Sequence, residues 1–263
     1  MMLKFLKYEI KRTKKYSIFF LLISLIFSIS IWSIAYIQKD KFNLFSLVNT
    51  SFLFLLFVFL LTNLIYFLLR FRKDIFSKTS YLTFTLDIST LKVFTAKFFA
   101  ALFLNLFLIF CYYLNFLIVK KLFELILKFN TTEIFPYRFI SVILILEIYW
   151  LMAYELLTLA FSFSKVKFFR KYFDFVSITF FTVLYVVLIG IMRNIYILFP
   201  YSFKITGNII KIKKIIGIDF LMIYFNKNLS MIGINIYMIF FSFSVILISF
   251  ILNLFIVKNK ADL

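Results

Sequence analysis

Histidine is absent from this sequence of 263 residues, and cysteine occurs only once, at Cys111. A single cysteine excludes an internal disulfide, and the lack of histidine excludes imidazole metal ligands and histidine acid–base chemistry. The patterns G-x-S-x-G, H-E-x-x-H and G-x-x-x-x-G-K-[ST] are missing too. These are signatures of serine hydrolases, zinc proteases and phosphate-binding loops. We therefore expect no enzyme activity, no metal site and no bound cofactor in this chain.

Apolar residues, in contrast, are abundant. They make up 64% of the chain, which is too apolar for a protein whose outside faces water. A bilayer core of about 30 Å needs about 20 apolar residues per helix. The apolar runs are long and unbroken, which favours helices over the short alternating strands of a membrane barrel. We predict an all-α, polytopic membrane protein with six transmembrane helices, at about 17–37, 44–69, 94–119, 139–163, 173–199 and 231–257.

The segments between these runs are short and basic. None is long enough for a folded catalytic domain of about 50 residues, so we expect residues 1–263 to form a single transmembrane domain. The first run follows basic residues and has no small-residue cleavage site, which is typical of an uncleaved signal anchor. Any chemistry is then expected within the membrane or on a partner protein.

Basic residues set the expected orientation. The N-terminal segment, the second and fourth connectors and the C-terminal tail together carry more Lys and Arg than the other three connectors. Because basic residues near a span resist translocation, both termini are predicted to lie in the cytoplasm. The net charge of +19 is explained by topology and by attraction to anionic membrane lipid, so we expect no nucleic-acid partner.

The first sixteen residues have an amphipathic pattern. Leu3, Leu6 and Ile10 fall on one side of a helix, beside several lysines. This pattern predicts a cytoplasmic amphipathic helix over residues 1–16 that lies in the membrane interface as an elbow. A basic tail that only sets topology is the alternative.

Three charged residues lie inside the predicted spans, where charges are costly and often functional. Glu147 and Arg193 are expected at similar depth and are allowed to pair, either to fix helix packing or to line a substrate pathway. Glu155 has no obvious partner, so its carboxyl group could be protonated. Four asparagines in the spans are expected to form hydrogen bonds between helices: Asn63, Asn105, Asn115 and Asn253.

Two connectors have distinctive patterns. In the second, charged residues give way to an apolar segment at residues 81–86, which predicts either a cytoplasmic docking surface or packing against the helix ends. The connector at 201–230 is basic, with an Ile-rich stretch at 209–218, and is expected on the outer membrane face.

The second connector also carries a family resemblance. Its residues Phe71-Arg72-Lys73-Asp74, then Tyr81-Leu82-Thr83-Phe84-Thr85-Leu86, with Lys92 and Lys97 beyond, resemble the permease subunits of bacterial ABC transporters of the type-2 exporter class. Asp87 stands where the family usually has proline. The opening segment 3–12 is similar to the family's amphipathic start, and six spans in this order cover nearly the whole chain.

The resemblance implies a permease in the bacterial plasma membrane that exports a substrate. It implies a homodimer or heterodimer with a second permease, and two copies of a separate ABC ATPase subunit that bind ATP and Mg²⁺. Docking of the ATPase would involve Phe76, Tyr81, Leu82, Phe84 and Leu86. The alternatives are an ion-coupled secondary transporter that uses Glu147 or Glu155, and a non-transporting membrane immunity or assembly protein. The sequence does not select a substrate.

Overall fold

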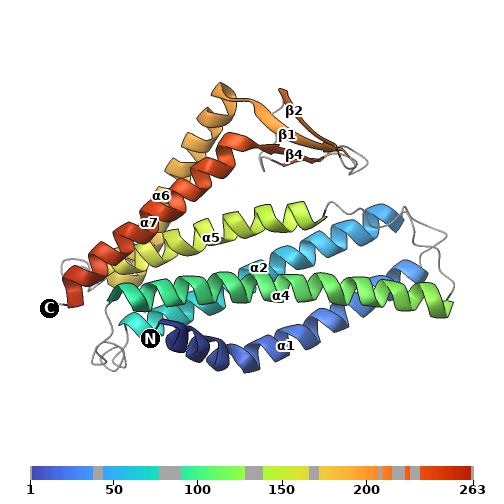
Figure 1. The fold of residues 1–263 in the computed structure, drawn as a ribbon, viewed down its shortest axis with the longest axis horizontal. Coiled ribbons are helices and arrows are strands. Elements are labelled where there is room, and N and C mark those ends of the chain that lie inside the picture. The colour runs from blue at the N-terminus through green and yellow to red at the C-terminus, as the bar shows by residue number, and fades with distance from the viewer. Residues whose placement is uncertain are drawn as a thin grey trace. The chain divides into compact units, whose positions relative to one another are not determined.

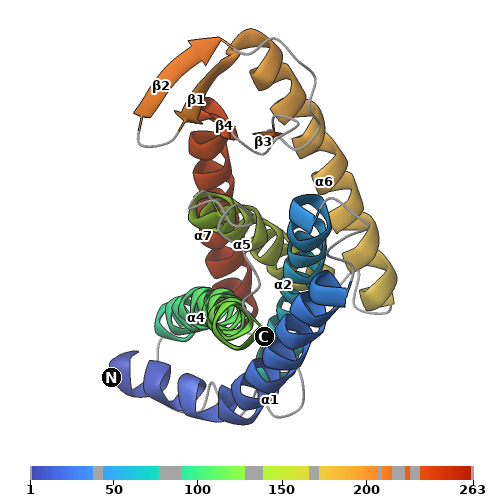
Figure 2. The same ribbon diagram turned by 90° about the vertical axis from the view of Figure 1, so that its right-hand side faces the viewer.

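The structure is a computed structural model, shown in Figure 1 and, turned by 90°, in Figure 2. It describes residues 2–37, 44–76, 90–127, 139–165, 172–206, 209–214, 223–225 and 232–261. The chain divides into two compact units, Met1–Phe139 and Ile140–Leu263, and each is described by itself. That the two form one transmembrane domain stays a prediction.

Six helices are long and apolar enough to cross a membrane, which confirms the predicted six-helix membrane class. The first unit holds α1 (Met2–Ile37), α2 (Leu44–Phe76) and α4 (Thr90–Leu127). The second holds α5 (Phe139–Ser164), α6 (Phe173–Leu198) and α7 (Ile236–Ala261). Each predicted span lies on one of these helices. However, α1 begins before the predicted start at 17, α2 and α4 extend beyond the predicted ends at 69 and 119, and α7 begins after 231 because a strand occupies the residues before it.

The three helices of the first unit pack around an aromatic core. Contacts between them show that α1 and α4 run in parallel and that α2 runs against both. Trp32 donates a hydrogen bond to the carbonyl of Phe116 (3.3 Å), and Tyr112 donates one to the carbonyl of Phe52 (3.3 Å). The rings of Phe52 and Tyr112 stack at 4.9 Å between centroids. Other phenylalanines, such as Phe107, are exposed, as expected for side chains that face lipid.

The predicted elbow at residues 1–16 is not confirmed as a separate helix. α1 is continuous from Met2 to Ile37 and bends along its length, as Figures 1 and 2 show. Ile10, expected on the apolar face, is exposed, whereas Glu9 and Thr13 are buried. The polar side of this segment therefore packs inside the unit, because it has charged partners there and Ile10 can face lipid.

A small antiparallel sheet joins α6 to α7 in the second unit. Its strands are β1 (Tyr201–Thr206), β2 (Ile209–Lys214), β3 (Ile223–Phe225) and β4 (Ile232–Asn235), in the order β2-β1-β4-β3. These strands were not among the predicted elements. Their register pairs Phe203 with Ile212 and Ile234, so apolar residues at alternate positions lie opposite one another. Such alternation of isoleucine with polar residues is typical of strands.

Asn235 fixes the point where the sheet passes into α7. Its side-chain oxygen accepts hydrogen bonds from the backbone N–H groups of Tyr237 (3.0 Å) and Met238 (3.2 Å), which caps the helix. Its amide nitrogen donates to the carbonyl of Phe199, just after the end of α6 (2.8 Å). One side chain thus ties the end of α6 to the start of α7.

Candidate functional site

Five charged side chains of the first unit meet where α1, α2 and α4 come together. We call this group the charge cluster: Glu9 and Arg12 from α1, Arg70 and Asp74 from α2, and Lys97 from α4. Three cations and two anions are thus held in one place. Charges inside a helix bundle are costly unless they are paired and hydrogen-bonded, so their pairing decides whether the bundle is stable.

Lys97 is the centre of the charge cluster. Its Nζ lies 2.5 Å from Oδ2 of Asp74 and 3.3 Å from Oε1 of Glu9, so one ammonium group bridges the two acids. The side chain of Lys97 is only 6% exposed. On the other side, Arg70 lies 2.5 Å from Oε2 of Glu9, and Arg12 lies 2.9 Å from Oδ1 of Asp74. Every pair joins two different helices, so the cluster ties α1, α2 and α4 together.

Hydrogen bonds between helices continue from the charge cluster into the bundle. The hydroxyl of Tyr16 donates to Oδ1 of Asn63 (2.5 Å), and Nδ2 of Asn63 donates to Oδ1 of Asn105 (2.7 Å). Farther along, Nδ2 of Asn115 donates to the hydroxyl of Ser24 (2.6 Å). These bonds confirm the prediction that the asparagines of the spans link helices.

The predicted docking residues lie next to the charge cluster in sequence. Phe76 is the last residue of α2, two positions after Asp74, and its side chain is outside the described part of the structure. The other four, Tyr81, Leu82, Phe84 and Leu86, lie outside the described residues. Their docking role stays a prediction.

Sequence reasoning did not single out the charge cluster. Glu9 and Asp74 each stand as the one acid within a basic stretch, and Lys97 is a lysine seven residues inside α4. A lone acid among bases near a helix end is a signal that could have suggested a buried ion pair. The basic neighbours were interpreted as topology signals instead.

In the second unit, Glu147 is buried on α5, while Arg193 is exposed on α6. The ion pairs of the described residues do not include one between them. The allowed Glu147–Arg193 pair is therefore not formed in this structure, because Arg193 lies on the outer side of α6.

Glu155 on α5 contacts Asn253 on α7. Nδ2 of Asn253 lies 3.3 Å from Oε2 of Glu155 and donates to the hydroxyl of Thr158 (2.9 Å). Glu155 is 3% exposed and Asn253 is fully buried. Among the described residues no cation pairs with Glu155, and Oδ1 of Asn253 is a buried acceptor without a donor. The confirmed role of Asn253 is thus to link α5 with α7.

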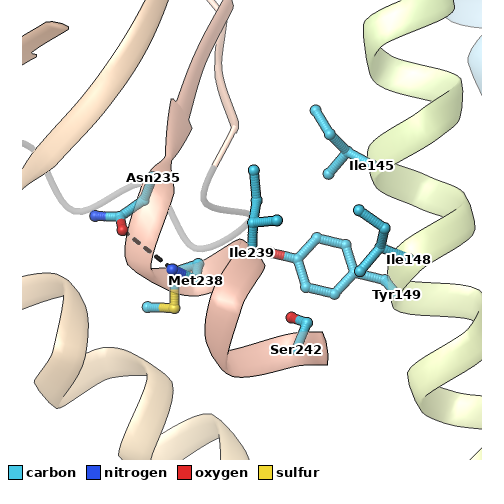
Figure 3. A pocket seen from close by; sticks show the side chains of 7 residues that line it. All are labelled: Ile145, Ile148, Tyr149, Asn235, Met238, Ile239 and Ser242. Carbon is cyan, nitrogen blue, oxygen red and sulfur yellow. Dashed lines mark hydrogen bonds between the residues drawn. The ribbon is translucent and has the colours of Figure 1, made fainter. Parts of the chain in front are cut away.

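A small cavity lies farther along the contact between α5 and α7 (Figure 3). Its volume is about 10 Å³, close to the least space that holds one water molecule. In the view, Tyr149 extends from α5 toward Ile239 of α7, with Ser242 nearby. The hydroxyl of Ser242 is buried and has no hydrogen-bond partner in the described part of the chain. This cavity therefore has a polar group as well as an apolar lining.

The two units thus offer different chemistry. The charge cluster joins three helices by ion pairs, whereas the Glu155–Asn253 contact holds an acid that has no cation partner among the described residues. Comparison of the chain with family models, with curated proteins and with solved structures finds no match.

Proposed function

We propose that this chain is the permease subunit of an ATP-driven ABC exporter of the type-2 class, located in the bacterial plasma membrane with both termini in the cytoplasm. The charge cluster is the observation that carries the proposal. It lies at the ends of α2 and α4 that flank the second connector, the segment with the family-like pattern. A permease needs a firm link between its ATPase docking segment and its spanning helices.

The charge cluster supplies such a link. Asp74 and Lys97 stand on either side of the connector and pair directly, and Glu9 adds α1 to the same group. Because each ion pair joins two helices, a displacement of the connector is passed to α1, α2 and α4 as one body. ATP binding to a docked ATPase dimer would supply that displacement and shift the helices between two states.

In this proposal the chain carries force and performs no chemistry. ATP and Mg²⁺ bind to two copies of a separate ATPase subunit. A second permease, identical or related, completes the membrane path. The exposed apolar side chains on α2, α4 and α6 are available for lipid and for this second permease.

The proposal predicts that an ATPase subunit co-purifies with the chain. The tagged protein is isolated from its host in mild detergent, and its partners are identified by mass spectrometry. Wild type is compared with the double variant Tyr81→Ala/Phe84→Ala and with Tyr8→Ala. Tyr8 is an aromatic residue on α1 that is 57% exposed, which makes it a matched control on the same predicted side.

We expect the ATPase with wild type and with Tyr8→Ala, and its loss from the double variant. Loss from all three samples under conditions that keep membrane complexes intact would reject the permease assignment. If the double variant retained the ATPase, the docking surface would have to lie outside residues 81–86.

A further inference from the structure

The contact between α5 and α7 contains a buried carboxyl group that pairs with no cation among the described residues. An ionised carboxylate inside an apolar region is costly unless a cation or several donors compensate it. The donor shown at the Glu155 carboxyl is the amide of Asn253, at 3.3 Å. The same amide also faces the carbonyl of Glu155 and the hydroxyl of Thr158, so its two hydrogens are shared among three acceptors.

Among the described side chains of the second unit, no charged group reaches this carboxyl. The charged groups of its helices that the structure describes are Glu147 on α5, Lys165 just after α5, Asp174 and Arg193 on α6, and Lys258 on α7. The tyrosines of these helices are Tyr149, Tyr154, Tyr185, Tyr196 and Tyr237. No hydrogen bond or ion pair of the described residues joins any of them to Glu155. A negative charge on Glu155 would thus be stabilised only by the amide of Asn253, which other acceptors share.

Asn253, in turn, has an amide oxygen that lacks a hydrogen-bond donor among the described residues. Its Oδ1 is fully buried and accepts no hydrogen bond in the described part of the chain. A buried acceptor without a donor is unfavourable, because it gives up its hydrogen bond to water without a replacement. A proton on Glu155 solves both problems. It removes the uncompensated negative charge, and it supplies an O–H group that can donate a hydrogen bond to the amide oxygen of Asn253. A carboxylic acid and a primary amide can then pair as donor and acceptor in both directions.

We propose that Glu155 is a proton-binding site, whose neutral carboxyl pairs with the amide of Asn253 and holds α5 against α7. The contact loosens when the proton leaves, which makes the α5–α7 contact sensitive to pH. This proposal does not rest on the permease assignment, because it uses only residues of the second unit.

A polar path leads along the same contact. Ser242, Ser249 and Asn253 are buried on one face of α7, at helical spacing. The cavity beside Tyr149 and Ser242 lies about three turns from Asn253 along α7. Hydroxyl groups, together with a cavity of this size, can form a route along which a proton passes to Glu155.

Infrared spectroscopy tests the proposal, since a protonated carboxyl and a carboxylate absorb at different frequencies. The full chain in lipid is compared with Glu155→Gln at neutral pH, and Glu124→Gln serves as a control because Glu124 has Lys120 as an ionic partner. We expect Glu155→Gln to remove a protonated-carboxyl band and Glu124→Gln to leave it. Removal of carboxylate bands by Glu155→Gln would overturn the proposal.

Two further measurements keep the test independent of how the variant folds. The pH of the wild-type sample is raised stepwise. We expect the protonated-carboxyl band to decrease and the melting temperature to fall, because ionisation places an uncompensated charge in the apolar interior and destabilises the folded state. Glu155→Gln, an uncharged mimic, should lose this pH dependence. In Asn253→Leu the band should shift in frequency. An unshifted band would overturn the pairing with Asn253.

Discussion

Lys97 illustrates how a single residue can decide the stability of the first unit. It is a buried ammonium that contacts two carboxylates from two other helices. Taking a lysine out of water is unfavourable, and the two acids compensate that cost only while both remain in place. Removal of the lysine leaves each acid with one arginine, Arg12 beside Asp74 and Arg70 beside Glu9, and takes away the cation that joins the two acids.

We predict that Lys97→Met destabilises the chain by about 3 kcal/mol, because it leaves buried carboxylates without their shared cation. Thermal unfolding in lipid or detergent measures the effect. Lys92→Met is the matched control, since Lys92 lies five residues earlier in α4 and is exposed. It should change stability little.

A second variant separates the effect of lost ion pairs from that of lost packing. Lys97→Met/Asp74→Asn removes one acid together with the lysine, so it should recover part of the stability that Lys97→Met loses. Equal losses in the single and double variants would mean that Lys97 contributes through its packing and that the ion pairs matter little.

The sequence cannot show such partners, because they are far apart along the chain. Glu9 and Lys97 are 88 positions apart, and nothing local distinguishes Lys97 from the lysines that set topology. The asparagines of the spans were predictable as a class, since an amide in an apolar helix needs a partner. Which partner each one finds depends on helix packing.

At the scale of elements, hydrogen bonds between helices add to the aromatic core. Asn105 accepts a hydrogen bond from Asn63, which in turn accepts one from Tyr16. We predict that Asn105→Ala destabilises the bundle by about 1 kcal/mol, the usual size of such bonds in membranes. Unfolding measurements in lipid or detergent check this.

Thr62→Ala provides the comparison for Asn105→Ala. Thr62 is exposed, and its hydroxyl donates to the carbonyl of Val58 within its own helix (2.8 Å). Its loss should leave stability almost unchanged, because no other helix is involved. If both variants lose the same stability, the bonds between α2 and α4 have no special importance.

The existence and order of the helices were predictable because each span is an unbroken apolar run. The extensions of α1, α2 and α4 beyond these runs were not, since they carry charged residues that are typical of connectors. The strands were not predicted, although Ile210-Lys211-Ile212-Lys213 alternates with the period of a strand. A short alternating segment gives a weak signal, and the partners β1 and β4 that stabilise it are separated in sequence. The predicted start of the last span at 231 includes β4 for the same reason.

At the scale of the whole molecule, helix directions within each unit fit successive spans that cross in alternate directions, whichever side the termini occupy. The start of α1, the end of α2 and the start of α4 meet at the charge cluster, as three successive spans require. In the second unit α5 and α7 run in parallel, since Tyr149 lies near Ile239 and Glu155 near Asn253. Spans four and six should run in the same direction, so this agrees as well.

The single cysteine makes this orientation easy to test. In a Cys111→Ala background, one cysteine at a time is introduced by Tyr8→Cys, Tyr201→Cys or Lys258→Cys, at positions that are exposed. We predict that a membrane-impermeant maleimide labels Tyr201→Cys in intact cells, because β1 follows α6 on the outer side. Tyr8→Cys and Lys258→Cys should react only after the cells are opened.

Each labelling pattern has a distinct meaning. If only Tyr8→Cys and Lys258→Cys were labelled in intact cells, the orientation of the chain would be the reverse of the predicted one. The charge cluster would then face away from any cytoplasmic ATPase. Labelling of only one of these two would mean an odd number of crossings, so one of the six helices would not span. The expected pattern keeps the connector after α2 in the cytoplasm, where the proposed partner must bind.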